Sequence, residues 1–83
     1  MKIEQWEVVG NKSLERIFKF KDFKEALGFV NRVGELAEEE NHHPDILLFS
    51  WNKVRITLTT HKEHRITDKD FNLAEEINKI YNK

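Results

Sequence analysis

The sequence predicts an α+β fold, in which a four-stranded antiparallel sheet carries two helices on one face, in the order ββαββα. Three observations predict it. Two segments repeat apolar residues at helical spacing, and each follows a residue suited to cap a helix N-terminus. Before each helical segment come two short segments rich in β-branched and aromatic residues, with turn-forming residues between them. The 83 residues suffice for one domain, predicted over 1–83, and not for two.

Two hairpins supply the predicted strands. In the last strand the apolar residues alternate with polar ones, so one face of that strand is expected to be buried. The strand before it is apolar on both faces. Its outward residues, Leu47, Phe49 and Trp51, are therefore expected to need a covering surface. The expected strands and turns are, in chain order, 6–9, turn 10–12, 14–20, 46–51, turn 52–53 and 54–60.

The first helix is predicted to begin after Asp22, with Glu25 placed to complete a capping box. It must end near Asn41, because Pro44 disfavours helical geometry in the residue before it. Phe29 and Leu36 are expected to widen its apolar face. The residues predicted to form that face are Phe23, Ala26, Leu27, Val30, Val33 and Ala37.

The second helix is predicted to begin after Thr67, which stands at its N-cap position. Asp70, three residues later, completes a second capping box. The apolar side of this helix consists of Phe71, Leu73, Ala74, Ile77, Ile80 and Tyr81.

Composition excludes several classes of function. Fourteen Lys and Arg oppose fifteen Asp and Glu, a formal net charge of −1, whereas nucleic-acid binding draws on a basic excess. No apolar run reaches the roughly 20 residues that span a bilayer, and residues 1–6 lack the apolar core of a secretory signal. The chain has no cysteines, which fits a reducing compartment. We therefore expect a cytoplasmic protein without nucleic-acid or membrane partners.

Histidines are the residues most suited to chemistry. Of the four, His42 and His43 follow the first helix, His61 ends the second hairpin, and His64 lies in the next loop. Catalytic groups concentrate at such junctions on a rigid scaffold. With an unperturbed pKa near 6.5, histidine can donate or accept a proton at neutral pH. A single surface histidine usually has no function, but an adjacent pair followed by Pro44 is harder to dismiss.

Four strings resemble the signature of the pterin-4a-carbinolamine dehydratase family (4a-hydroxytetrahydrobiopterin dehydratases). They are EEENHHPD at 38–45, WNKV at 51–54, LTTH at 58–61 and ITDKD at 66–70. The upstream strings FKFKDF at 18–23 and FVNRV at 29–33 are also similar to that family. The resemblance extends over almost the whole chain.

This resemblance implies a hydro-lyase that converts a 4a-hydroxytetrahydropterin to quinonoid dihydropterin and water, in tetrahydropterin recycling after an aromatic amino acid hydroxylase. The reaction involves no oxidation or reduction, so no redox cofactor is expected. Histidines can supply both the acid and the base. His42 and His61 match the family's acid–base histidines, and His43 matches its third active-site histidine. Asp70 matches an acid that orients the His61 imidazole. The residues expected at the substrate are Glu38, His42, His43, Pro44, Thr60, His61, Lys62 and Glu63.

Two departures from the family pattern bear on the substrate fit. The segment between His43 and Asn52 is one residue longer than in the animal enzymes, which favours a β-bulge in that strand. Arg65 stands where many members have glycine, so the loop is expected to differ if that position needs a positive φ.

Other readings of the same residues remain open. His42, His43, His61 and Asp70 are a possible zinc ligand set, although adjacent histidine side chains usually point apart; we expect no metal. The same fold is compatible with another pterin substrate, such as a molybdopterin-type compound. The resemblance also allows a role as a dimerisation or transcriptional cofactor module. For assembly, the two-sided apolar strand and the resemblance both favour a homodimer or homotetramer.

Overall fold

A computed structural model describes residues 5–82, and residues 1–4 and 83 lie outside the described part. The predictions about a leader segment at 1–6 and a domain from 1 to 83 therefore fall partly outside it. The predicted order ββαββα and the α+β class are confirmed. The elements are β1 (Glu7–Val9), β2 (Ser13–Lys19), α1 (Phe23–Glu40), β3 (Asp45–Phe49), β4 (Lys53–Leu58) and α2 (Asp68–Tyr81).

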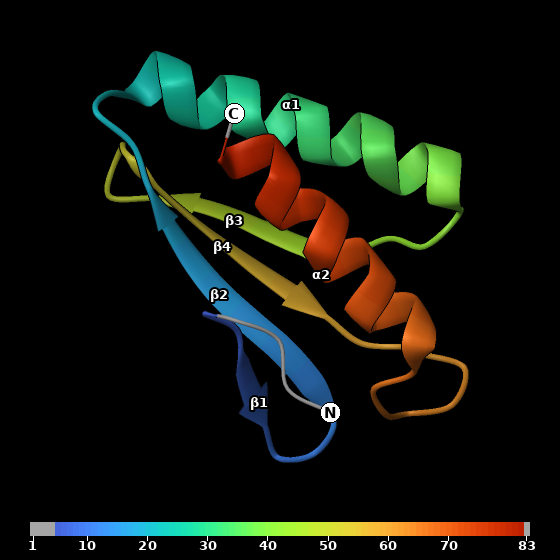
Figure 1. The fold of residues 1–83 in the computed structure, drawn as a ribbon. Coiled ribbons are helices and arrows are strands. Elements are labelled where there is room, and N and C mark those ends of the chain that lie inside the picture. The colour runs from blue at the N-terminus through green and yellow to red at the C-terminus, as the bar shows by residue number, and fades with distance from the viewer. Residues whose placement is uncertain (1–4, 83) are drawn as a thin grey trace.

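The four strands form one antiparallel sheet in the order β1-β2-β4-β3. The two hairpins lie side by side, because β2 of the first pairs with β4 of the second. Figure 1 shows both helices on the same side of this sheet. The C-terminal end of α1 and the N-terminal end of α2 lie toward the same end of the fold, near where β3 begins and β4 ends.

The core lies between the sheet and the helices. Strands β2, β3 and β4 contribute alternate residues, as predicted for β4, whose Val54, Ile56 and Leu58 are fully buried. Burying a side chain of this size stabilises the fold by about 1.5–3 kcal/mol. Trp6, just before β1, is also buried and donates its Nε1–H to Asn78 Oδ1 of α2 at 2.8 Å. This bond ties the N-terminal hairpin to the last turns of α2.

Helix α1 begins and ends as predicted, but its buried face is different. Asp22 is the N-cap and accepts from the Glu25 N–H at 2.8 Å, and Asn41 ends the helix in the left-handed conformation with φ 52°. Phe29 is fully buried, whereas Phe23 is 51% exposed and Leu27 is also exposed. The expectation that Phe23 and Leu27 face the core was therefore wrong, and Phe29 is central. The buried residues of α1 are Ala26, Phe29, Val33 and Ala37.

The second hairpin differs from the prediction at its turn. The expected turn at 52–53 includes Asn52 correctly but begins too late, and the strand expected to residue 51 was too long, because β3 ends at Phe49. The chain reverses through Ser50 and Trp51, both with positive φ, and β4 begins at Lys53. The expected bulge was also wrong, since β3 pairs with β4 in continuous register from Asp45 with Thr57 to Phe49 with Lys53. The longer segment therefore does not distort this pairing.

The sheet face away from the helices carries exposed apolar side chains. Leu47 of β3 lies across from Arg55, and Arg55 lies across from Ile17 of β2, so the three form one row. Ile17 is 54% exposed, Leu47 44% and Trp51 60%. Leu47 and Trp51 thus lie on the surface as expected. No helix within residues 5–82 is both long and apolar enough to cross a membrane.

Candidate active site

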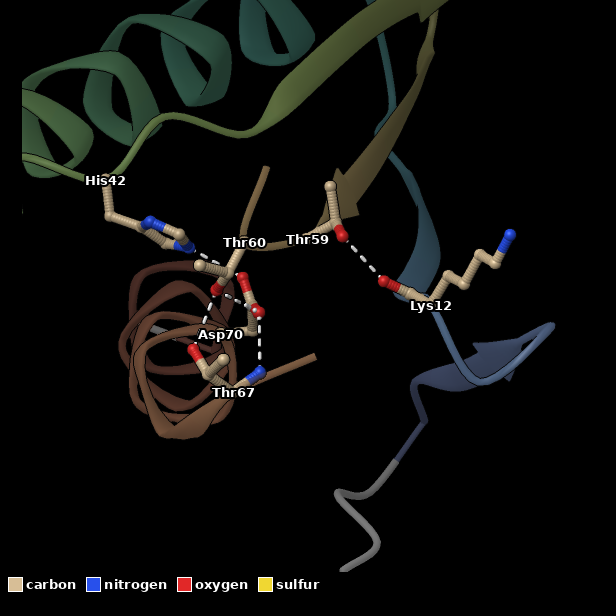
Figure 2. Close-up of polar contacts among 6 residues, drawn as sticks. All are labelled: Lys12, His42, Thr59, Thr60, Thr67 and Asp70. Carbon is tan, nitrogen blue, oxygen red and sulfur yellow. Dashed lines mark hydrogen bonds and ion pairs between the residues drawn. The ribbon is translucent and has the colours of Figure 1, made fainter. Parts of the chain in front are cut away.

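A buried carboxylate, Asp70, organises the polar contacts at the end of the fold where the histidines lie. Its side chain is fully buried, at the third position of α2. Asp70 Oδ2 accepts from the Thr67 backbone N–H at 3.0 Å and from the Thr60 hydroxyl at 2.9 Å, and Oδ1 contacts His42 Nε2 at 2.6 Å (Figure 2). At this helix-capping position, which the sequence predicted, the Asp70 carboxylate also contacts His42 and Thr60.

His42 reaches Asp70 because of the way α1 ends. The left-handed Asn41 reverses the chain, and the His42 N–H donates to the Ala37 carbonyl at 3.1 Å, as in a Schellman-type helix end. His42 is thereby held beside the first turn of α2 and is only partly exposed. The contact with Asp70 joins residues 28 positions apart in the sequence.

Thr60 contributes from the end of β4. It is 7% exposed, and its backbone pairs with Arg65 across the loop that carries the third predicted histidine. Its hydroxyl lies 2.7 Å from the Thr67 hydroxyl. Since Thr60 donates its single proton to Asp70, Thr67 is the donor in that second bond. The segments that directly follow α1 and β4 thus meet the first turn of α2 at one carboxylate (Figure 2).

The contact with Asp70 fixes which ring nitrogen of His42 carries a proton. An ionised carboxylate only accepts hydrogen bonds, so His42 Nε2 donates to Asp70 Oδ1. In the neutral imidazole the remaining nitrogen, Nδ1, then has the free lone pair. A histidine held in this way is equipped to take up a proton at Nδ1, with the carboxylate stabilising the imidazolium that forms.

The other predicted site residues lie around this network, mostly exposed. His43 Nε2 contacts Glu38 Oε2 at 2.5 Å, so these two predicted site residues pair with each other. Pro44 is half-buried at the start of β3. His61, Lys62 and Glu63 are exposed in the turn that begins at Thr60, where the Glu63 N–H donates to the Thr60 carbonyl at 3.0 Å.

One predicted pairing differs from the structure. Asp70 was expected to orient His61, whereas its carboxylate contacts His42, and its other oxygen is occupied by Thr60 and Thr67. His61 instead follows directly after Thr60, on the exposed turn. The φ above zero in this loop belongs to His64, at 55°, and Arg65 is outside that region. Arg65 therefore needs no glycine-like conformation.

Sequence reasoning missed the side-chain roles of two threonines. Thr60 was expected beside the substrate through its backbone, and Thr67 only as a helix cap. Their hydroxyls are in fact linked to each other and, through Thr60, to Asp70. The string LTTH followed by ITDKD contains both threonines and the aspartate, but only the folded loop shows that they meet.

The comparisons agree with the resemblance of the sequence. The family described as pterin 4 alpha carbinolamine dehydratase matches residues 1–80. The chain belongs to this family. Two bacterial relatives carry the provisional name pterin-4-alpha-carbinolamine dehydratase. That of Alkaliphilus metalliredigens is 54% identical over 92% of this chain and 68% of its own length, and that of Rubrobacter xylanophilus is 53% identical over 90% and 69%.

Two solved structures have the same fold. A transcriptional coactivator/pterin dehydratase from Brucella melitensis superimposes with a TM-score of 0.87 at 38% identity, over 94% of this chain and 83% of that one. A pterin dehydratase-like protein, described as a RuBisCO assembly factor of the alpha-carboxysome, gives a TM-score of 0.79 at 21% identity, over 94% and 90%. The second likeness shows the fold alone.

The most voluminous of the described cavities lies away from this network. It measures about 680 Å³ and is formed by the first turns of α1, the end of β2 and the last turn of α2. Lysines, an arginine and aromatic rings dominate its lining, and Glu25, its acid, is paired with Lys21. Proton transfer at neutral pH calls for groups such as histidine, and no histidine is among the residues that line this cavity.

The zinc ligand set considered from the sequence does not assemble in the described part of the chain. His42 and His43 contact different carboxylates, Asp70 and Glu38. Across residues 5–82, no three histidine or acidic side chains converge on a position that could hold a metal ion.

Proposed function

We propose that this protein is a dehydratase that converts a 4a-hydroxytetrahydropterin to the quinonoid dihydropterin. One observation carries the proposal: the fully buried Asp70 contacts His42 Nε2 at 2.6 Å, in a chain whose family is named for this reaction. A buried carboxylate paired with a histidine is the arrangement that acid–base catalysts use to orient an imidazole.

The proposed reaction requires two proton transfers and no change of oxidation state. The bond between C4a and the hydroxyl oxygen breaks, and an acid protonates that oxygen so that it leaves as water. The lone pair of the neighbouring ring nitrogen forms a C=N double bond to C4a. A base removes the proton from the ring. The substrate thus gains one proton from the acid and loses one to the base. The acid then takes a proton from solvent and the base releases one, which restores both groups.

We assign the base to His42, because its Nδ1 has the free lone pair when Nε2 donates to Asp70. His61 is the proposed acid at the leaving oxygen, since it directly follows Thr60 and so stands one residue from the same carboxylate network. His43, with Glu38, is proposed to border the substrate. Pro44, Lys62 and Glu63 complete the proposed binding surface.

The proposed substrate is the product of another class of enzyme. A 4a-hydroxytetrahydropterin is produced when an aromatic amino acid hydroxylase uses a tetrahydropterin, so we propose that this protein returns that product toward the reduced cofactor in the cytoplasm. We further propose a homodimer or homotetramer. The exposed Ile17 and Leu47 on the open sheet face, and the exposed Trp51 in the turn after β3, support an assembly of this kind.

The test is a direct assay with synthetic 4a-hydroxytetrahydropterin. The absorbance change that accompanies formation of quinonoid dihydropterin is followed with and without the protein, and the spontaneous rate is subtracted. We expect a rate that is proportional to protein concentration and saturates with substrate. A rate equal to the spontaneous one at micromolar protein would remove the proposal, and a molybdopterin-type compound would then be the next substrate to assay.

A further inference from the structure

The buried hydroxyl of Thr60 is hydrogen-bonded to two other members of the network. Thr60 is nearly inaccessible to solvent, and its side-chain proton goes to Asp70 Oδ2 at 2.9 Å. From the other side, the Thr67 hydroxyl donates to Thr60 Oγ1 at 2.7 Å. The hydroxyl is thus held between a carboxylate and a second threonine, and its orientation is fixed by both (Figure 2).

The backbone of Thr60 is fixed as well. Its N–H donates to the Arg65 carbonyl at 3.1 Å, and its carbonyl accepts from the Glu63 N–H at 3.0 Å. These bonds close the turn in which His61 is the first residue. Thr60 therefore links two parts of the proposed site: its main chain anchors the turn of His61, and its side chain anchors the carboxylate that holds His42.

We propose that Thr60 is a positioning residue that sets the tautomer of His42 and the spacing between His42 and His61. The catalytic part of this inference rests on the proposed dehydratase function. The structural part does not, because the two donors to Asp70 Oδ2, the Thr60 hydroxyl and the Thr67 N–H, together hold the carboxylate plane that places Oδ1 against His42. Without the Thr60 hydroxyl, Oδ2 keeps a single donor, the Thr67 N–H at 3.0 Å, and the carboxylate plane can tilt so that the contact with His42 Nε2 weakens.

Two substitutions at Thr60 separate the hydroxyl from the shape of the side chain. Thr60→Val has nearly the same volume and lacks the donor, while Thr60→Ser keeps the donor. Thr59→Val is the matched control: Thr59 is the adjacent residue, and its hydroxyl also makes a hydrogen bond, 2.6 Å to the Lys12 carbonyl, outside the network (Figure 2). A fourth variant, Thr67→Val, removes the donor behind Thr60.

The first measurement is the tautomer of His42, read from nitrogen chemical shifts and two-bond couplings in protein labelled with ¹⁵N-histidine. The wild type, Thr60→Ser and Thr59→Val are expected to show the Nε2–H form. Thr60→Val is expected to show a mixture of Nε2–H and Nδ1–H forms. This readout needs no substrate, so it decides the structural part even if the protein proves not to be a dehydratase.

The second measurement is dehydration of the synthetic carbinolamine. Loss of a hydrogen bond to a charged group is expected to lower kcat of Thr60→Val by about 10-fold or more, with KM changed less than kcat. Thr60→Ser should recover most of the loss, and Thr59→Val should retain the wild-type rate. If Thr60→Val fails to fold, Thr67→Val replaces it, with a smaller decrease of about 3-fold expected.

The outcomes separate the two claims. A Thr60→Val protein with the wild-type tautomer and wild-type kcat overturns the positioning role. A wild type that shows no dehydration but changes tautomer in Thr60→Val refutes the proposed function and supports the positioning role. An equal loss of kcat in Thr60→Val and Thr60→Ser also contradicts the inference, because it assigns the effect to side-chain shape and not to the hydroxyl.

Discussion

Replacing Asp70 by asparagine exchanges one carboxylate oxygen for an NH₂ group and leaves the shape of the side chain intact. The Thr67 backbone N–H can only donate, so the amide oxygen of the new side chain must take the place of Oδ2, 3.0 Å from that nitrogen. The amide NH₂ then faces His42 in the place of Oδ1. Since both groups cannot donate to each other, His42 Nε2 must become an acceptor, and the ring proton must move to Nδ1.

The size of the effect follows from this switch. The lone pair of His42 would point at the asparagine and not at the substrate, so the proposed base would be lost. A positioned acid or base contributes about 10²–10⁴ in rate, and the corresponding wrong-tautomer substitution in a serine protease triad lowers kcat about 10⁴-fold. We therefore expect Asp70→Asn to lower kcat by about 10²–10⁴. The fold should survive, because the shape is kept and hydrogen bonds to Thr60 and Thr67 remain possible.

The assay is the dehydration of synthetic carbinolamine, with Asp68→Asn as the control. Asp68 lies in the same first turn of α2 and is exposed, so the control makes the same change of charge near the helix N-terminus outside the network. Asp68→Asn should retain the wild-type kcat. Circular dichroism verifies that Asp70→Asn is folded. A folded variant with kcat within about 2-fold of wild type would refute the reasoning, since a positioned base contributes at least about 10²-fold in rate.

Three further predictions concern stability, metals and assembly. Phe29→Ala should lower the free energy of unfolding by about 3–5 kcal/mol in urea titration, and the half-exposed Phe23→Ala by less than about 1 kcal/mol; equal effects would contradict the observed face of α1. Dialysis against a chelator should leave the dehydration rate unchanged, and a loss that zinc restores would favour the metal reading. Light scattering at micromolar concentration should give at least twice the 10.0 kDa of one chain, and Leu47→Lys should shift it toward the monomer; a clean monomeric mass in the unsubstituted protein would exclude the proposed assembly.

Much of the fold was predictable because its signals are local. Thr67 and Asp70 mark the start of α2 within four residues of sequence, and the alternation of β4 predicts its buried face. The end of α1 at Asn41 follows from Pro44. Local signals of this kind depend on backbone geometry and not on the rest of the chain.

The face of α1 was less predictable because several registers satisfy the same period. Leu27 lies about 100° around the helix from Ala26, so a stripe that includes Phe23 and Leu27 and one that includes Phe29 both show helical spacing. Contact with the aromatic core decides between them, since the Phe29 ring packs against the Phe18 ring with their centroids 4.8 Å apart. That contact joins α1 to β2 and has no signature in the α1 sequence.

The candidate site shows the same division. The histidines and Asp70 were predicted from their strings, yet the partner of Asp70 depends on how the end of α1 meets the start of α2. His42 and His61 are both compatible with the sequence as partners. Only the position of the reversed chain after Asn41 brings His42 within 2.6 Å of the carboxylate.

The most direct test of the account is the dehydration rate of four alanine variants, measured in parallel with the unsubstituted protein. His42→Ala and His61→Ala are each predicted to lower the rate by about two to four powers of ten. His43→Ala, whose partner Glu38 is exposed, should have a smaller effect. His64→Ala, a histidine outside the proposed site, is the control and should keep the wild-type rate. If His42→Ala and His61→Ala both turned over substrate at the wild-type rate, the histidine mechanism proposed for this fold would be wrong.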